Sequence, residues 1–139
     1  MLDQFELVGR AVADPNRIRI LTMLKGGELC VCQITAVLEL AAATVSKHLS
    51  LLRMAGLVRQ RKDGRWIYYR LAEHGANPYA PGMLALVATL VIDGDPVLEG
   101  DCVRLAAVKD IALDVLCAPD GKAAVSAACC GGSVDVHAN

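Results

Sequence analysis

Residues 44–71 read TVSKHLSLLRMAGLVRQRKDGRWIYYRL, and this stretch decides the fold. Its first half places Val45, Leu49 and Leu52 on one helical face, and Gly56 follows at the point where such a helix would end. Its second half contains two runs of β-forming residues on either side of an Asp-Gly turn, which is typical of a β-hairpin. The stretch therefore predicts a helix followed directly by a hairpin.

The pattern on both sides of this stretch is helical. Asp14 is suited to cap a helix and Pro15 to occupy its first turn, and the Gly-Gly pair at 26–27 would end that helix. The expected helices cover about 3–12, 15–25, 30–38, 44–54, 81–92 and 96–116, and the expected strands cover 58–61 and 66–71. This order predicts a winged helix-turn-helix, mainly α with a β-hairpin wing, in which 44–54 is the recognition helix.

The composition suits a small helical protein. Of 139 residues, 55% are apolar and only 4% aromatic, so the core must be built from aliphatic side chains. We expect a DNA-binding and dimerisation domain at 1–93, a C-terminal helix at 94–117 and a flexible Ala/Gly/Ser-rich tail at 118–139. The apolar run 83–92 is too short to span a membrane, and the acidic amphipathic start is unlike a signal peptide. A cytoplasmic protein without a membrane partner is therefore expected.

Positive charge is concentrated in the middle of the chain. The net charge is −1, but residues 44–70 contain seven Lys or Arg and a single acid. Polar side chains on the outer face of the recognition helix can enter a major groove, and the basic hairpin tip can reach phosphate. We therefore expect double-stranded DNA as the partner, contacted by Thr44, Ser46, Lys47, His48, Ser50, Arg53, Arg61, Lys62 and Arg65.

Several motifs together resemble the ArsR/SmtB family of winged-helix repressors. They are DPNRIRIL at 14–21, ELCVC at 28–32, VSKHL at 45–49, RKDGRW at 61–66 and YYRL at 68–71. The resemblance implies a homodimer that binds operator DNA and dissociates when a thiophilic ion binds. Within that family the ELCVC segment resembles the arsenic- and antimony-responsive repressors, which implies As(III) or Sb(III) as the inducer.

The chain has six cysteines, and two of them lie in the ELCVC segment. Thiolate sulfur suits soft ions such as As(III) and Sb(III), so Cys30 and Cys32 are the expected ligands. Those sensors often carry a third cysteine three residues further on, where this chain has Thr35. A third ligand must then be a non-protein group or another cysteine, among Cys102, Cys117, Cys129 and Cys130; Cys102, Cys129 and Cys130 are the expected auxiliary ligands. A two-thiol site would also suit methylarsenite.

The position of Cys30 and Cys32 predicts how binding becomes a switch. Side chains two residues apart in an α-helix point about 200° apart, because a turn takes 3.6 residues. Sulfurs that bind one ion must converge, so we expect coordination to unwind or re-aim the start of the 30–38 helix and to transmit this strain to the recognition helix.

Other interpretations stay open. Cysteine is often a small buried hydrophobe, and this is the favoured interpretation of Cys102 and Cys117 on the apolar stripe of the C-terminal helix. A thiol-redox or sulfane-sulfur responsive repressor on the same fold would join two cysteines through sulfur rather than through an ion. A soft-ion carrier or scavenging enzyme would leave the basic wing without a purpose, and no catalytic or organic-cofactor motif is present.

The apolar helix expected at 83–92 is the candidate dimerisation helix. It lacks the Asp, His and Glu ligands that zinc- and cadmium-responsive members of the family use after the wing. Its uniform apolarity suits burial between two subunits, and the alternative is a helix in the core of one subunit. We expect a homodimer.

Overall fold

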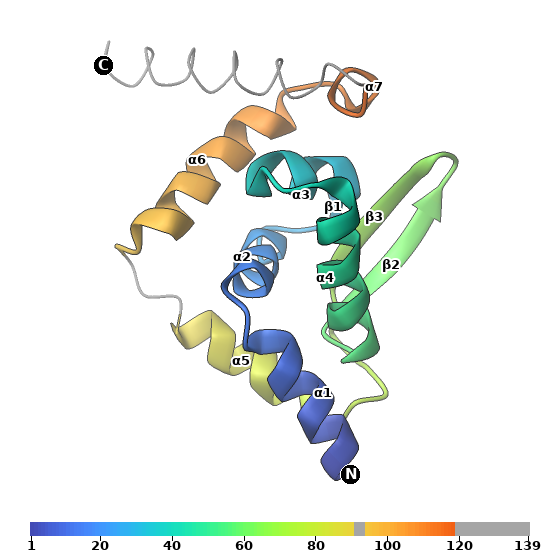
Figure 1. Cartoon of the computed structure of the whole chain (residues 1–139), viewed down its shortest axis with the longest axis vertical. Coiled ribbons are helices and arrows are strands. Elements are labelled where there is room, and N and C mark those ends of the chain that lie inside the picture. Colours follow the sequence, from blue (N-terminus) through green and yellow to red (C-terminus); the bar gives the residue numbers. More distant parts are fainter. Residues whose placement is uncertain (91–93, 119–139) are drawn as a thin grey trace.

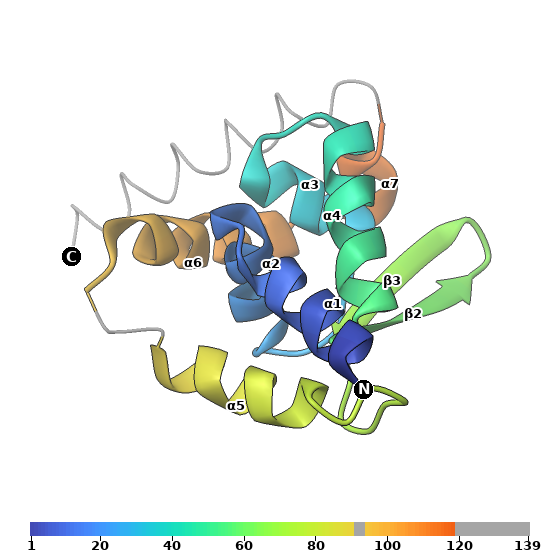
Figure 2. The same ribbon diagram turned by 60° about the horizontal axis from the view of Figure 1, so that its bottom comes forward.

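The computed structural model describes residues 1–90 and 94–118. In chain order the elements are α1 (Leu2–Val12), α2 (Pro15–Leu24), β1 (Leu29–Cys30), α3 (Val31–Leu38), α4 (Ala42–Met54), β2 (Val58–Asp63), β3 (Trp66–Leu71), α5 (Ala80–Leu90), α6 (Pro96–Lys109) and α7 (Leu113–Leu116). Figures 1 and 2 show the β2–β3 hairpin projecting beyond the helices as a wing. The predicted winged helix-turn-helix is confirmed.

Helix α2 begins where the sequence predicted. The Asp14 carboxylate accepts hydrogen bonds from the backbone N–H groups of Asn16 at 2.8 Å and Arg17 at 3.3 Å, and Pro15 occupies the first turn. These bonds satisfy N–H groups that have no partner within the helix. The Arg17 guanidinium also donates to the carbonyl of Ala11 at 2.7 Å, which fixes the end of α1 against α2.

Helices α3 and α4 form the helix-turn-helix and are bent by 115° relative to each other. The inner face of α4 is fully buried at Val45, Leu49 and Leu52, as the spacing predicted. Helix α4 ends at Met54, and Gly56 two residues later turns the chain: its φ of 75° favours glycine, and an added Cβ there would lie 3.1 Å from the Cβ of Asn77. The opposite face of α4, which includes Ser46, Lys47 and Ser50, is polar and exposed.

A three-stranded antiparallel sheet joins the wing to the helices. Its strand order is β1-β3-β2, and β1 places Leu29 opposite Tyr69 and Cys30 opposite Tyr68. Strand β1 was not predicted, because two residues carry no period-two pattern, and Cys30 was instead expected in the following helix. Cys30 is thus part of the wing sheet and the last residue before α3.

The C-terminal helix predicted at 96–116 is two helices. Helix α6 ends at Lys109, and the chain resumes as α7 only at Leu113. Ala112 between them is extended, with φ −60° and ψ 141°, and this break turns the chain. Helix α6 packs against α2 and α3, and α7 packs against α3 (Figure 1).

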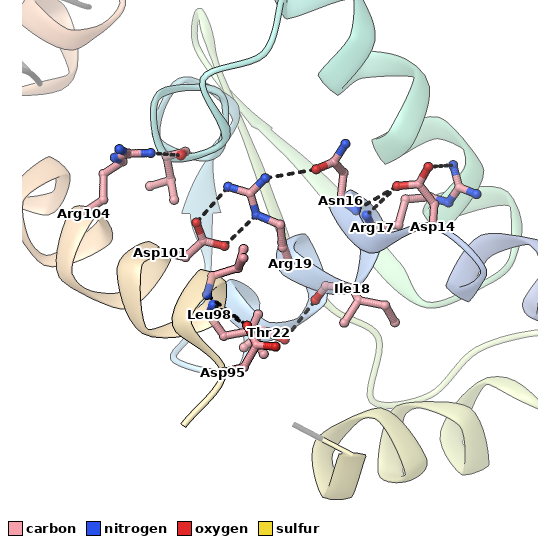
Figure 3. A network of polar contacts seen from close by, with 12 residues as sticks. Asp14, Asn16, Arg17, Ile18, Arg19, Thr22, Asp95, Leu98, Asp101 and Arg104 are labelled. Carbon is pink, nitrogen blue, oxygen red and sulfur yellow. Dashed lines mark hydrogen bonds and ion pairs between the residues drawn. The ribbon is translucent and has the colours of Figure 1, made fainter. Parts of the chain in front are cut away.

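A nearly buried ion pair fastens α6 to α2. Arg19 donates from Nε to Oδ2 of Asp101 and from Nη2 to Oδ1, both at 2.8 Å (Figure 3). A third guanidinium bond, from Nη1 to Asn16, measures 3.0 Å. The Asp101 side chain is only 7% exposed. The hydrogen bonds to Asp101 raise the pKa of Arg19 above its usual value.

Replacing Asp101 with Ala should destabilise the fold markedly, since the Arg19 guanidinium would keep its charge without a partner. Loss of one partner of a buried pair costs about 3 kcal/mol or more. Urea unfolding at fixed protein concentration measures this loss. The matched control is Arg10→Ala, which breaks the exposed pair with Glu6 and should cost under about 1 kcal/mol. Equal losses in the two variants would contradict the assigned role of the Arg19–Asp101 pair.

Helix α5 covers part of α2 and leaves apolar side chains in solvent. Val87 is buried, whereas Leu86 is 49% exposed. On the N-terminal helix α1, Phe5 and Leu2 are also largely exposed. Among the described residues no single helix has the length and apolarity to cross a membrane, and only the sharply bent pair α3–α4 meets both criteria jointly.

Candidate functional site

Three cysteine sulfurs meet where β1, α3 and α7 come together. The Sγ atoms of Cys30, Cys32 and Cys117 all lie within 4.8 Å of one another. No other cluster of at least three Cys, His, Asp or Glu ligands occurs in 1–90 and 94–118. Cys32 and Cys117 are joined as a disulfide, and Cys30 is a free, buried thiol beside it.

Cys30 and Cys32 converge because only one of them is helical. Cys30 is the N-cap of α3 and has an extended backbone, with φ −71° and ψ 147°, whereas Cys32 lies in the first turn. The Cys30 N–H donates to Oε1 of Gln33 at 2.9 Å, which holds this geometry. The expectation that an ion must unwind the helix to bring the two sulfurs together is therefore wrong, because they already face a common point.

The other cysteines behave differently from expectation. Cys102, predicted as buried or as an auxiliary ligand, is exposed on α6 and lies outside the sulfur group, because the buried face of α6 runs through its neighbour Asp101. Cys117, also predicted on a buried stripe, is half-buried because α7 is a separate helix. Cys129 and Cys130, like the predicted tail beyond residue 118, fall outside the described residues.

An opening of about 240 Å³ borders the sulfur site. It is lined by Arg65 and Trp66 from the wing and by Asp114, Cys117 and Ala118 from the C-terminal segment. The sulfur site therefore adjoins the wing as well as the helix-turn-helix.

An ion pair connects the wing to the residue just before β1. Arg61 donates to the Glu28 carboxylate from Nη2 at 2.6 Å and from Nε at 3.1 Å. This hydrogen bonding lowers the pKa of Glu28 and raises that of Arg61. The Arg61 guanidinium also lies 4.5 Å from the ring centroid of Tyr68, the residue opposite Cys30. Arg61 was expected to contact DNA, and its pairing with Glu28 was not predicted, because a partner 33 residues away in the chain leaves no local signal.

The outer face of α4 is exposed. The predicted DNA-contacting residues that lie in solvent are Thr44, Ser46, Lys47, Ser50 and Arg53 on α4, with Arg61, Lys62 and Arg65 on the wing. Arg53 hydrogen-bonds to Gln60 of β2, which ties the recognition helix to the wing. Arg65 stacks over Trp66 at 4.4 Å from the ring centroid.

His48 is half-buried at the contact between α4 and α2. Its Nδ1 lies 3.2 Å from Nη1 of Arg17. An arginine guanidinium only donates hydrogen bonds, so Nδ1 is the acceptor in this contact. His48 thus contributes to packing at the base of the recognition helix.

A chain with this exposed polar helix, basic wing and helix-turn-helix core is a winged-helix transcriptional regulator, not an enzyme. The comparisons with known proteins agree and identify its family. Residues 14–60 match the protein family described as "Bacterial regulatory protein, arsR family". The chain is also 38% identical over 102 residues to the arsenic resistance transcriptional regulator ArsR1 of Pseudomonas putida, covering 72% of this chain and 76% of that protein. The chain belongs to the ArsR family.

Two further relatives extend the comparison. A cadmium resistance regulatory protein, a CadC homologue from Staphylococcus aureus, is 42% identical over 65 residues; the match covers 46% of this chain and 54% of that protein. The homodimeric winged helix-turn-helix DNA-binding domain of a Mycobacterium bovis regulator superposes with a TM-score of 0.55 at 35% identity, covering 64% of this chain and 79% of that one. Relatives named for arsenic and relatives named for cadmium are therefore both similar in sequence to this chain.

Proposed function

We propose that the protein is a cytoplasmic, metalloid-responsive repressor that holds operator DNA as a homodimer and releases it when Cys30 and Cys32 bind trivalent arsenic or antimony. The observation that carries the proposal is the meeting of these two sulfurs at the shared base of the helix-turn-helix and the wing. Thiolates are the protein ligands best suited to such soft ions. The arsenic resistance regulator ArsR1 of P. putida, similar over most of its length, supports the choice of arsenic.

The position of Cys30 supplies two routes to the DNA-binding surface. As the N-cap of α3, it lies at the start of the helix that precedes the recognition helix. As the partner of Tyr68 in the sheet, it also adjoins the wing strand β3. An ion bound by both sulfurs would therefore act on β1 and on the start of α3 together. A differential affinity of about 1–3 kcal/mol between the two states changes operator binding roughly 5- to 150-fold.

The test is a titration of the reduced, operator-bound protein with arsenite, antimonite, methylarsenite, zinc, cadmium and polysulfide. Fluorescence anisotropy of the labelled operator reports release. Release at the lowest concentration by arsenite or antimonite is the expected result. Release only by zinc or cadmium would contradict the proposed inducer.

DNA recognition leads to a separate prediction. Lys47 on the recognition helix should discriminate bases, so Lys47→Ala should bring operator affinity close to that for random duplex. Lys62 at the wing has no carboxylate partner among the described residues. Lys62→Gln should weaken binding to every sequence and reduce the salt slope by about one. Affinities for operator and random duplex over a salt series measure both effects. An unchanged salt slope in Lys62→Gln would place the wing away from the phosphates.

A thiol-redox response is the second candidate, and the Cys32–Cys117 disulfide favours it. Oxidation would remove two thiol protons and two electrons and would close the bond without Cys30. Cys30→Ser therefore separates the candidates. It should keep any release caused by an oxidant or polysulfide and lose release caused by arsenite.

A further inference from the structure

We propose that Cys117 is the third protein ligand, so that the inducer site is a three-thiolate site built from β1, α3 and the C-terminal helix α7. This inference rests on the proposed function and specifies the ligand set of its site. Thr35 cannot serve as that ligand, since its hydroxyl donates to the Val31 carbonyl at 2.8 Å within α3. The Cys117 sulfur, in contrast, lies within 4.8 Å of both other sulfurs.

The C-terminal segment is anchored so that it presents Cys117 to this site. Asp101 on α6 is fixed to Arg19 of α2. Three residues further along, Arg104 donates from Nη1 to the Val37 carbonyl at 3.1 Å (Figure 3). It also pairs through Nη2 with Glu39 at 3.3 Å. Helix α6 therefore holds the C-terminal end of α3, while α7 reaches its N-terminal end.

An ion bound by all three thiolates would attach the C-terminal segment to the second end of α3. Arg104 already holds the turn between α3 and α4 through Glu39, the residue with left-handed backbone that follows α3. A bond from the ion to Cys117 would add a second attachment at Cys30 and Cys32. The C-terminal segment would then be attached to both ends of α3. A shift of this segment on ion binding would rotate α3 relative to the core.

The chemistry balances for an inorganic trivalent ion. The Cys32–Cys117 disulfide must first be reduced by a thiol or phosphine reductant, which supplies two electrons and is itself oxidised. Three thiols then replace the three hydroxyl groups of arsenous acid: three As–S bonds form, three As–O bonds break, and three waters leave. Arsenic stays trivalent. Methylarsenite keeps its As–C bond and has only two hydroxyls to exchange, so Cys30 and Cys32 satisfy it without Cys117.

This difference gives a sharp test on the full-length reduced protein. Cys117→Ser should raise the arsenite concentration for half-release of operator by about tenfold or more, and should leave release by methylarsenite close to wild type. Cys102→Ser is the matched control, since it removes an exposed cysteine from the same segment. It should respond like wild type to both arsenicals.

X-ray absorption at the arsenic edge counts the ligands directly. Three sulfur neighbours in the wild type, and two sulfurs with one oxygen in Cys117→Ser, are the expected result. If Cys117→Ser keeps three sulfurs and normal release, Cys117 is not a ligand, although the proposed function stands. If the reduced wild type neither binds arsenite nor releases DNA, the proposed function itself fails.

Discussion

Reduced protein carrying Cys30→Ser or Cys32→Ser is expected to stay on its operator at arsenite concentrations that release the wild type. Each variant removes one of the two sulfurs that face the common point beside Cys117. The unliganded fold should survive, because serine is a favoured N-cap residue at position 30 and Cys32 is only half-buried. Operator binding without inducer should therefore remain within about threefold of wild type, a difference worth less than 1 kcal/mol.

Two controls make this result interpretable. Cys102→Ser should release DNA normally, since its exposed thiol lies outside the sulfur group. Thermal unfolding of Cys30→Ser and Cys32→Ser shows whether the fold is intact. A Cys30→Ser protein that is released by arsenite like the wild type would exclude Cys30 as a ligand and place sensing elsewhere.

A negative charge at Leu86 should produce monomers that no longer hold operator. Leu86 is 49% exposed on α5, although the residues around it are apolar, and Leu2 and Phe5 of α1 are exposed as well. We expect these side chains to be buried between two subunits, and the M. bovis domain of the same fold is homodimeric. Leu86→Glu would bury an unpaired carboxylate in that interface, which costs several kcal/mol.

Sedimentation velocity of Leu86→Glu measures the oligomeric state, and anisotropy measures operator binding. Val103→Glu is the control, since Val103 is also an exposed apolar residue, 61% exposed, and lies on α6. If Leu86→Glu stays dimeric and Val103→Glu becomes monomeric, the interface lies on α6 and the prediction for α5 is wrong. A single half-site is held weakly, so operator binding should be lost with the dimer.

The sequence predicted the features of the fold that depend on local patterns. The Asp14-Pro15 start of α2, the buried face of α4 and the Asp-Gly hairpin each carry a short-range signal, and the structure confirms them. The two-residue strand β1 exists only because β3 lies beside it, so no local signal could reveal it. The break between α6 and α7 likewise follows from packing against α3.

The sulfur site was predicted only in part for the same reason. The spacing of Cys30 and Cys32 indicated a soft-ion pair, but helical geometry suggested that the two sulfurs diverge. They converge because Cys30 belongs to a strand. Cys117 lies 85 residues from Cys32, and Asp101 lies 82 from Arg19, so both contacts depend on the tertiary fold alone.

One titration tests the central claim most directly: arsenite added to the reduced wild-type protein on labelled operator, with As–S absorbance and operator anisotropy recorded in the same cuvette. The proposed mechanism predicts that both signals change together and saturate at one arsenic per subunit. Stoichiometric As–S formation with the operator still bound would contradict it, because coordination at the cysteines would then not be coupled to DNA release.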